Sequence, residues 1–231
     1  MKTVHSFLLF LLPSLLFSET RTFTSSDGKS LSASLIKVSG NTAYIQIASG
    51  KTYQLPLERL SEEDQRYVKD WQKKEEANFI PRLSLDFSSG KGDSKDGTDY
   101  DNRSQTLRPG VKVENRELEF HLKGAEGHVF LFGTDVINRR SVKVLSRQNF
   151  PIASLAAGQE LAWEGKPVKV QYDDNNAARF GHAYSGYLAI ITNKSGKILA
   201  TAGTTSFIKK AEAALELKSG AIADRDLRPA R

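Results

Sequence analysis

The stretch between residues 172 and 187 holds the densest group of side chains that could do chemistry. It places two acids, an arginine, a histidine and three tyrosines between two apolar runs. Tyrosine rings can stack on a sugar or a peptide, while carboxylate and guanidinium groups add directed hydrogen bonds. One hypothesis is therefore a ligand-binding rim formed by Tyr172, Asp174, Arg179, His182 and Tyr184. The simpler interpretation is a long hairpin whose aromatic side chains cover the edge of a sheet.

The same stretch is poorly arranged for catalysis. Asp173 and Asp174 are adjacent, and neighbouring residues on a strand point to opposite faces, which is unsuitable for shared acid–base work. Ser185 lacks the glycine that a nucleophile elbow needs two residues earlier, and no histidine belongs to an H-E-x-x-H zinc motif. The absence of cysteine excludes thiol nucleophiles and iron–sulfur clusters. We assign no catalytic residue and expect a protein that is not an enzyme.

A second oxygen-rich segment spans residues 90–102. Its glycines and aspartates could gather oxygen ligands for calcium. The spacing departs from an EF-hand loop, because Gly92 and Ser94 occupy two of the positions that precede Gly97. We interpret the segment as a solvated loop and expect no cofactor and no metal, with calcium binding as the alternative.

These segments belong to a second module that we place at residues 81–210. Strand-like runs recur along it and predict an antiparallel β-sandwich. The runs are residues 83–87, 111–122, 129–132, 142–145, 168–172, 186–192 and 198–202. Residues 187–191 are continuously apolar, which indicates a central strand. A short helix and a frayed tail are expected over residues 211–231.

The first module, residues 19–76, shows a clearer pattern. Apolar residues alternate with polar ones in three short runs that begin at Leu31, Ala43 and Tyr53, and glycine-containing turns separate these runs. Ser61, followed by acids in the next three positions, predicts the start of a helix that closes the module. Pro81 then prevents the helix from continuing nearby.

Several residues of this module resemble the Sla-one homology (SHD-one) family over about residues 21–70. The resemblance rests on Arg21 to Thr24, on Gly28, Ala33, Gly40 and Gly50, and above all on the L-P-L-x-x-L-S-x-x-D-x-x-Y motif at residues 55–67. It implies a small Src-homology-3-like barrel with a closing helix. An endocytic adaptor of the family binds Asn-Pro-Phe-x-Asp peptides. Phe23 stands where tryptophan is common and Ile47 where the adaptor has a basic residue, so we do not transfer that ligand.

The motif itself has a structural interpretation, in which its apolar residues fix the helix across the end of the barrel. Pro56 lacks an N–H group and suits the edge of a sheet. A functional alternative is a ligand-facing surface that combines aromatic rings with cations. Its candidate residues are Tyr44, Lys51, Tyr53 and Arg59.

Residues 1–18 have the pattern of a secretory signal peptide. One lysine precedes an apolar run that is too short for a membrane-spanning helix and contains Pro13. We therefore predict a secreted or periplasmic bacterial protein with no membrane span after signal cleavage. Residues 81–231 hold 23 Lys and Arg against 18 Asp and Glu, an excess too small for a nucleic-acid-binding stripe, and export makes nucleic acid an unsuitable partner.

Taken together, these patterns indicate a mainly β, exported binding or structural protein without catalytic activity. Its expected partner is a protein or a polysaccharide of the cell envelope. Two alternatives stay open at this point. One is a carbohydrate-active enzyme with its acids in the 172–187 segment, and the other is a purely structural component of the cell surface.

Overall fold

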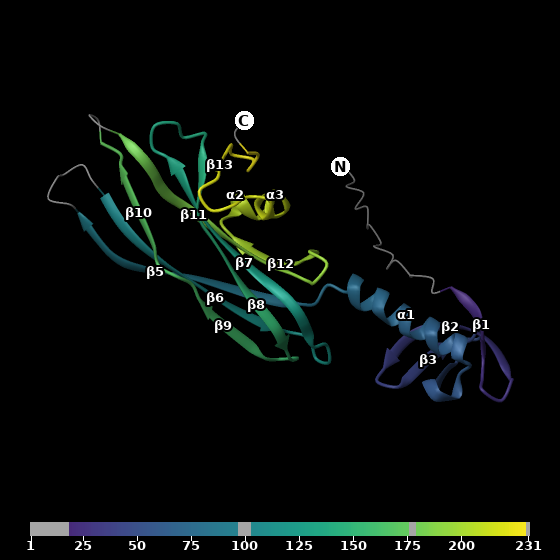
Figure 1. Ribbon diagram of the computed structural model, residues 1–231. Coiled ribbons are helices and arrows are strands. Elements are labelled where there is room, and N and C mark those ends of the chain that lie inside the picture. Colours follow the sequence, from purple (N-terminus) through teal and green to yellow (C-terminus); the bar gives the residue numbers. More distant parts are fainter. Residues whose placement is uncertain (1–18, 97–102, 176–178, 230–231) are drawn as a thin grey trace, which may run out of the picture. The chain divides into compact units, whose positions relative to one another are not determined.

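The computed structural model describes residues 19–96, 103–175 and 179–229 (Figure 1). The chain forms two compact units, of which the first ends at Phe79 and the second begins at Ile80. Both units are built mainly from antiparallel strands. None of the helices in these described ranges combines the length and the apolar character that crossing a bilayer requires.

The first unit is a four-stranded antiparallel sheet with a helix packed on one face. Its elements are β1 (Thr20–Thr24), β2 (Ser30–Ser39), β3 (Thr42–Gln46), β4 (Thr52–Pro56), the short 3-10 helix η1 (Leu57–Arg59) and α1 (Glu62–Asn78). The alternating residues Ala33, Leu35, Ala43 and Ile45 are buried, together with Val68 of α1. The predicted alternation and the predicted helix start after Ser61 are therefore confirmed.

This sheet is not closed. Its strands follow the order β1-β2-β3-β4, and the described ladders do not join β1 to β4. The backbone returns to the end of β1 through an isolated bridge between Ser25 and Leu60 and through single hydrogen bonds, such as Ser61 N to Thr24 O at 2.8 Å. The closed Src-homology-3-like barrel expected from the resemblance is not confirmed, because β4 leads into η1 instead of pairing with β1.

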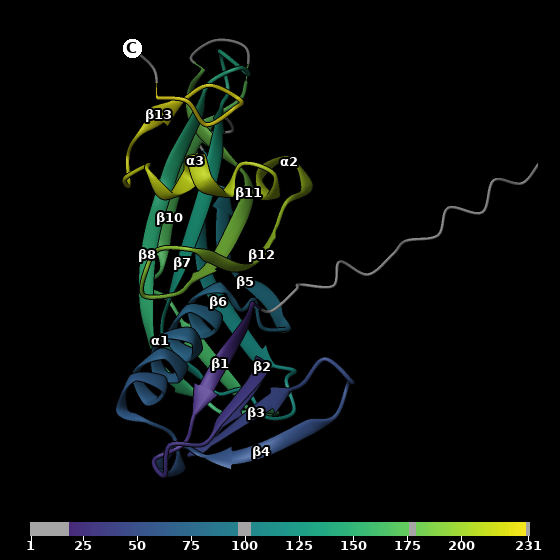
Figure 2. The ribbon, with the colours of Figure 1, turned by 90° about the vertical axis from the view of Figure 1, so that its right-hand side faces the viewer.

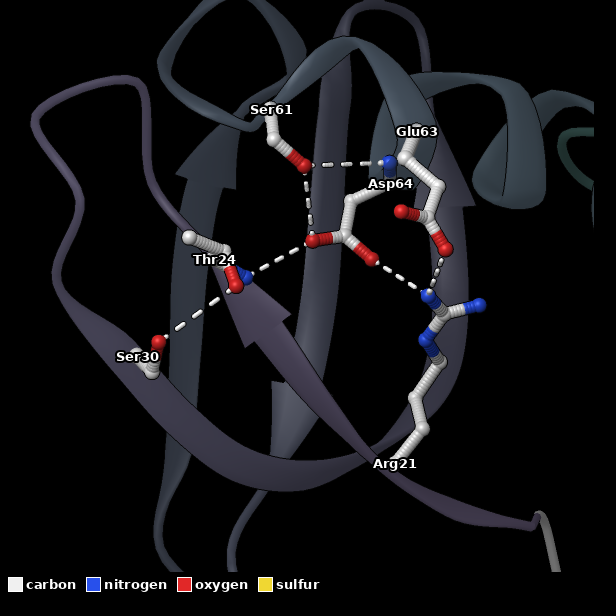
Figure 3. Close-up of polar contacts among 6 residues, drawn as sticks. All are labelled: Arg21, Thr24, Ser30, Ser61, Glu63 and Asp64. Carbon is white, nitrogen blue, oxygen red and sulfur yellow. Dashed lines mark hydrogen bonds and ion pairs between the residues drawn. The ribbon is translucent and has the colours of Figure 1, made fainter.

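A buried carboxylate joins α1 to the first strand (Figure 3). Asp64 is only 2% exposed. Its Oδ2 accepts hydrogen bonds from Thr24 N (2.7 Å) and Ser61 Oγ (3.0 Å), and its Oδ1 accepts one from Arg21 Nη2 (2.7 Å). The Arg21 guanidinium also lies 3.9 Å from the centre of the Tyr67 ring. The serine, aspartate and tyrosine of the L-S-x-x-D-x-x-Y pattern thus hold the start of the helix against β1.

The second unit contains nine strands in one antiparallel sheet, with the order β13-β8-β7-β11-β10-β6-β5 and with β12 on β11 and β9 on β6. Two short helices follow the eighth of these strands. The elements are β5 (Leu83–Asp96), β6 (Arg103–Asn115), β7 (Leu122–Asp135), β8 (Val142–Leu155), β9 (Glu160–Glu164), β10 (Val168–Asp173), β11 (Phe180–Thr192), β12 (Ile198–Gly203), α2 (Thr205–Ile208), α3 (Ala211–Leu215) and β13 (Ile222–Ala223).

The sheet folds over into two packed layers. Strands β5, β6, β9 and β10 form one layer, and the other strands form the second; β10 joins β11 by only two residue pairs, Tyr172 with Gly181 and Asp173 with Phe180. Side chains from both layers share one core, as in the stack of Phe87 on Tyr187 with 3.7 Å between ring centres. The predicted sandwich therefore has its two layers, but they are parts of one continuous sheet.

A second core lies on the other face of β7, β8 and β11 (Figure 2). Phe130 and Phe132 of β7 are fully buried there under α2, α3 and the segment that follows them. Leu217 and Leu227 are also buried in this core. The tail that was expected to fray after the short helix is therefore packed as far as Leu227, because the apolar face of the sheet needs a cover.

Three stretches of the second unit differ from the expected strand pattern. The run 111–122 is broken, since Leu118 is 87% exposed in a loop where Asn115 Nδ2 donates to the carbonyls of Phe120 (2.8 Å) and Leu155 (3.0 Å). Strand β5 continues through Gly90 to Asp96, part of the segment interpreted as a loop. Strand β9 was not predicted, because its five residues carry a single alternation.

Replacing Asp64 with alanine is expected to destabilise the first unit by about 3 kcal/mol, because Thr24 N–H and the partly buried Arg21 lose their acceptor. Urea unfolding followed through the fluorescence of Trp71, in a Trp163→Phe background, measures this loss. Glu63→Ala is the matched control, since Glu63 is 83% exposed and lies 3.9 Å from Arg21. Equal unfolding midpoints for the two variants contradict the role assigned to Asp64.

Replacing Phe207 with alanine is expected to destabilise the second unit by about 3–5 kcal/mol, because its ring stacks on Phe132 with 4.2 Å between centres. The neighbouring variant Ile208→Ala, at an exposed position, is expected to lose about 1 kcal/mol or less. Unfolding followed through Trp163, in a Trp71→Phe background, compares the two. A Phe207→Ala protein as stable as the parent shows that α2 is not a cover for the sheet.

Candidate functional site

The outer face of the first sheet is covered with hydroxyl groups. Three threonines of β1 stand directly opposite three serines of β2, in the pairs Thr20–Ser34, Thr22–Ser32 and Thr24–Ser30. These residues alternate with the buried ones, so their side chains point away from α1. Thr20 Oγ1 lies 3.0 Å from Ser34 Oγ. Figure 3 shows the second pair, in which Thr24 Oγ1 lies 3.4 Å from Ser30 Oγ.

The same face continues across β3 and β4 with larger polar groups. Ser34 stands opposite Gln46, and Lys37 stands opposite Tyr44, which in turn stands opposite Gln54 of β4. The Lys37 ammonium lies 5.9 Å from the centre of the Tyr44 ring. We call this surface the polar face; it consists of Thr20, Thr22, Thr24, Ser30, Ser32, Ser34, Lys37, Tyr44, Gln46, Thr52 and Gln54.

Hydroxyl and amide groups both donate and accept hydrogen bonds, and a tyrosine ring adds an apolar platform. The polar face contains no carboxylate among these residues, so it offers neither a general acid nor a general base of that kind. Its groups repeat about every 4.8 Å from strand to strand and about every 7 Å along a strand. This arrangement can form repeated hydrogen bonds with an extended polar molecule.

The four candidates of the first unit do not form one surface. Tyr44 lies on the polar face, but Tyr53 is in register with buried Ile45 and packs on the opposite, core-facing side of the sheet. The Lys51 ammonium lies 4.8 Å from the centre of the Tyr53 ring. Arg59 ends η1, where its carbonyl accepts a hydrogen bond from Ser26 N at 2.9 Å. The structure therefore separates Tyr44 from the other three.

In the second unit, the candidate tyrosines lie between the layers. Tyr172 and Tyr184 are partly buried against Leu107, Leu131 and Val170. Burial raises the pKa of Tyr184, and a hydrogen bond with Ser89 acts in the opposite direction. These rings fill the core, which is the simpler interpretation of the segment, and they offer no open platform for a ligand.

His182 is also directed inward, beside Asp135. Its Nε2 lies 3.7 Å from Asp135 Oδ2. Burial lowers the pKa of His182; the Asp135 carboxylate opposes this shift, and Lys143 adds to it. Asp135 Oδ1 accepts hydrogen bonds from Ile137 N and Asn138 N, both at 2.8 Å, and these backbone N–H groups hold the pKa of Asp135 below its ordinary value. The aspartate therefore organises a turn.

The remaining candidates are exposed. Asp174 pairs with Arg103, whose Nε lies 3.1 Å from Asp174 Oδ1, and Arg179 lies just before β11. Asp173 is buried, and its Oδ1 accepts a hydrogen bond from Asn175 N at 2.7 Å. The two adjacent aspartates thus have opposite environments, as expected. The five rim candidates divide into three inward and two exposed side chains, so the structure does not bring them together.

Metal binding finds no support in the described ranges. Within residues 19–96, 103–175 and 179–229, no three acidic or histidine side chains gather closely enough to hold a metal ion. The calcium alternative concerned residues 90–102, of which 97–102 lie outside the described part of the chain.

Comparison with known proteins does not identify a family. No protein-family model matches the chain, and no curated protein is similar enough to count as a relative. A crystal structure from Akkermansia muciniphila is 13% identical, with 60% of this chain and 77% of that chain covered and a TM-score of 0.33. A Northeast Structural Genomics Consortium target is 7% identical, with 52% and 84% covered and a TM-score of 0.30.

A family GH18 chitinase from Chromobacterium violaceum is 12% identical, with 84% of this chain but only 33% of the chitinase covered and a TM-score of 0.21. All three TM-scores are too low to establish a shared fold or to suggest an activity.

The buried histidines make the second unit sensitive to acid. Burial lowers the pKa values of His128 and His182 below 6.5, so the unfolded chain binds these protons at a higher pH than the folded one. The free energy of unfolding of the second unit is therefore highest above about pH 6.5. It decreases as the pH falls towards the folded-state pKa values of the two histidines. Urea midpoints measured through Trp163 should decrease between about pH 7.5 and pH 5.5.

The variant His182→Gln is expected to weaken this pH dependence, whereas His121→Gln, at an exposed position, should leave it unchanged. Two results would contradict the claim that buried histidines make the second unit sensitive to acid. They are a urea midpoint that rises on acidification and an identical pH profile for both variants.

Proposed function

We propose that this protein is an exported, non-catalytic binding protein whose first unit holds a polysaccharide of the cell envelope on its polar face. The observation that carries the proposal is the composition of that face: paired threonine and serine hydroxyls on β1 and β2, continued by Tyr44 between Lys37 and Gln54. The pattern of residues 1–18 and the resemblance of residues 21–70 to SHD-one domains support export.

The chemistry of the polar face matches a neutral, hydroxyl-rich chain. Each Ser or Thr hydroxyl can donate one hydrogen bond and accept two, which complements sugar hydroxyls of either orientation. The ring of Tyr44 is half-buried and can stack on the apolar face of a sugar. Because the hydroxyls belong to paired strands, their positions are fixed before a ligand arrives, and binding costs little side-chain entropy.

A protein partner is less well matched to this surface. Protein interfaces are built around buried aromatic and aliphatic anchors, with polar groups at the rim. Among the exposed large apolar side chains of the described residues, only Ile36 belongs to the four strands of this sheet. The carbohydrate-active alternative needs two carboxylates that flank one bond. The acids of the 172–187 segment do not favour it, because Asp173 is buried and Asp174 is exposed and paired with Arg103.

Co-sedimentation with insoluble purified peptidoglycan, followed by affinity electrophoresis in gels that contain soluble neutral polysaccharides, tests the proposal. We expect Tyr44→Ala to weaken binding about tenfold, because stacking and ring burial are lost. Thr22→Val, which keeps the shape of the side chain but removes its hydroxyl, is expected to weaken it severalfold.

Lys69→Ala is the control, because Lys69 is exposed on α1, which packs on the other side of the sheet. The proposal fails if the parent protein retains no polysaccharide, or if Tyr44→Ala binds as tightly as Lys69→Ala.

A further inference from the structure

The turn between β7 and β8 presents an exposed apolar residue on an ordered tip. Ile137 is 67% exposed, although its own backbone N–H donates to Asp135 Oδ1 at 2.8 Å. Ser141 N donates to Asn138 O at 2.8 Å, and Asp135 N donates to Ser141 O at 3.0 Å. The turn is therefore held from inside by Asp135 and Asn138, while Ile137 points into solvent.

A second apolar side chain lies beside this tip. Asp135 is in register with His182, and Val136 N donates to Gly181 O at 3.2 Å, so the turn leaves β7 beside the first residues of β11, which begins at Phe180. Phe180 is 45% exposed. Ile222 of β13 is exposed as well, and β13 pairs with the first residues of β8, next to the same turn (Figure 1).

The charges around these apolar residues favour an anionic partner. Arg139 and Arg140 are exposed in the turn, and the ion pairs found among the described residues involve neither of them. Arg225 donates to the carbonyl of Arg139 at 3.3 Å, which adds a third cation to the tip.

The acids described near the turn already have partners. Asp174 pairs with Arg103, Asp226 lies 3.5 Å from Lys210, and Asp224 Oδ1 accepts from two backbone N–H groups. The Asp135 carboxylate accepts from two backbone N–H groups of the turn. None of these contacts involves the guanidinium group of Arg139 or Arg140, so both groups can contact a negatively charged ligand.

We propose that this tip, formed by Ile137, Arg139, Arg140, Phe180, Ile222 and Arg225, docks on the surface of a bilayer that contains anionic phospholipids. Isoleucine and phenylalanine side chains can enter the boundary between headgroups and acyl chains, while arginines beside them contact lipid phosphates. The tip is a convex hairpin end with few apolar residues. A stable protein interface needs about 20–30 residues on each side, so a fluid lipid surface fits the tip better.

The inference concerns the second unit and does not depend on the polysaccharide proposed for the first. If both hold, the protein connects an envelope polymer to a membrane surface. The linkage is non-covalent, and neither half requires a catalytic group.

Vesicle co-sedimentation tests the docking proposal. The probe is the chain from Glu19 onward, which contains both folded units, mixed with vesicles of two parts phosphatidylcholine and one part phosphatidylglycerol, or with phosphatidylcholine alone. We expect binding to the anionic vesicles and at least tenfold weaker binding to the neutral ones. Each arginine near an anionic surface contributes about a fivefold effect, so Arg139→Gln/Arg140→Gln should weaken binding about 25-fold. Ile137→Ser should weaken it about tenfold.

Two matched controls separate the tip from general effects. Lys123→Gln/Lys194→Gln makes the same change in net charge on exposed residues at the opposite end of β7 and β11. Leu118→Ser removes an exposed apolar side chain from the β6–β7 loop, also at that end. Both controls should bind like the parent, and the Trp163 fluorescence of every variant should match the parent to show that the second unit is folded.

Four results overturn the proposal. They are binding to neither vesicle, equal binding to both vesicles, equal loss of binding in the tip variants and their controls, and complete displacement by millimolar free glycerol phosphate. The last result indicates a site for isolated phosphate groups instead of a bilayer surface. A parent protein that binds vesicles but no polysaccharide leaves this inference standing and removes the proposed function alone.

Discussion

The burial of both faces of β7 and β11 is the constraint on which the second unit depends. Along β7, Val129 and Leu131 enter the core between the layers, while Phe130 and Phe132 enter the core under α2 and α3. Each such side chain contributes about 1.5–3 kcal/mol when it is removed from water. Two separate covers are therefore required, and they are provided by the layer of β5, β6, β9 and β10 and by the C-terminal helices. The surfaces left for ligands are the ends of the strands and the outer faces.

The first unit has a smaller sheet with one buried face, and a single helix covers that face. Its sheet buries only the face that α1 contacts, and Asp64 fixes the start of α1 against β1 through Thr24 and Arg21. The strand alternation that directs Ala33 and Ile45 inward necessarily directs the Ser, Thr, Gln and Tyr44 side chains outward. Core and polar face are thus two results of one pattern.

Much of this architecture could be predicted from the sequence. Local signals were sufficient for three of the four strands of the first unit, for the Ser61 helix start and for residues 187–191, which form part of a central strand. The binding surfaces could not be predicted in this way, because they depend on pairing between distant residues. Tyr44 and Tyr53 both looked available, and only the register of Tyr53 with Ile45 places them on opposite sides. The placement of the β7–β8 turn beside the start of β11 likewise requires residues 135 and 182 to be aligned, which no local pattern indicates.

Hydrogen exchange at individual backbone amides, measured by mass spectrometry or NMR on the chain from Glu19, tests the central constraint most directly. The account predicts the slowest exchange in the second unit at residues 129–132 of β7 and 188–191 of β11, where both faces are covered, and faster exchange in β9 and in the β7–β8 turn. If amides in the centre of β7 exchanged as fast as those in β9, the account would be contradicted. Such rapid exchange would mean that the two faces of β7 are not both covered.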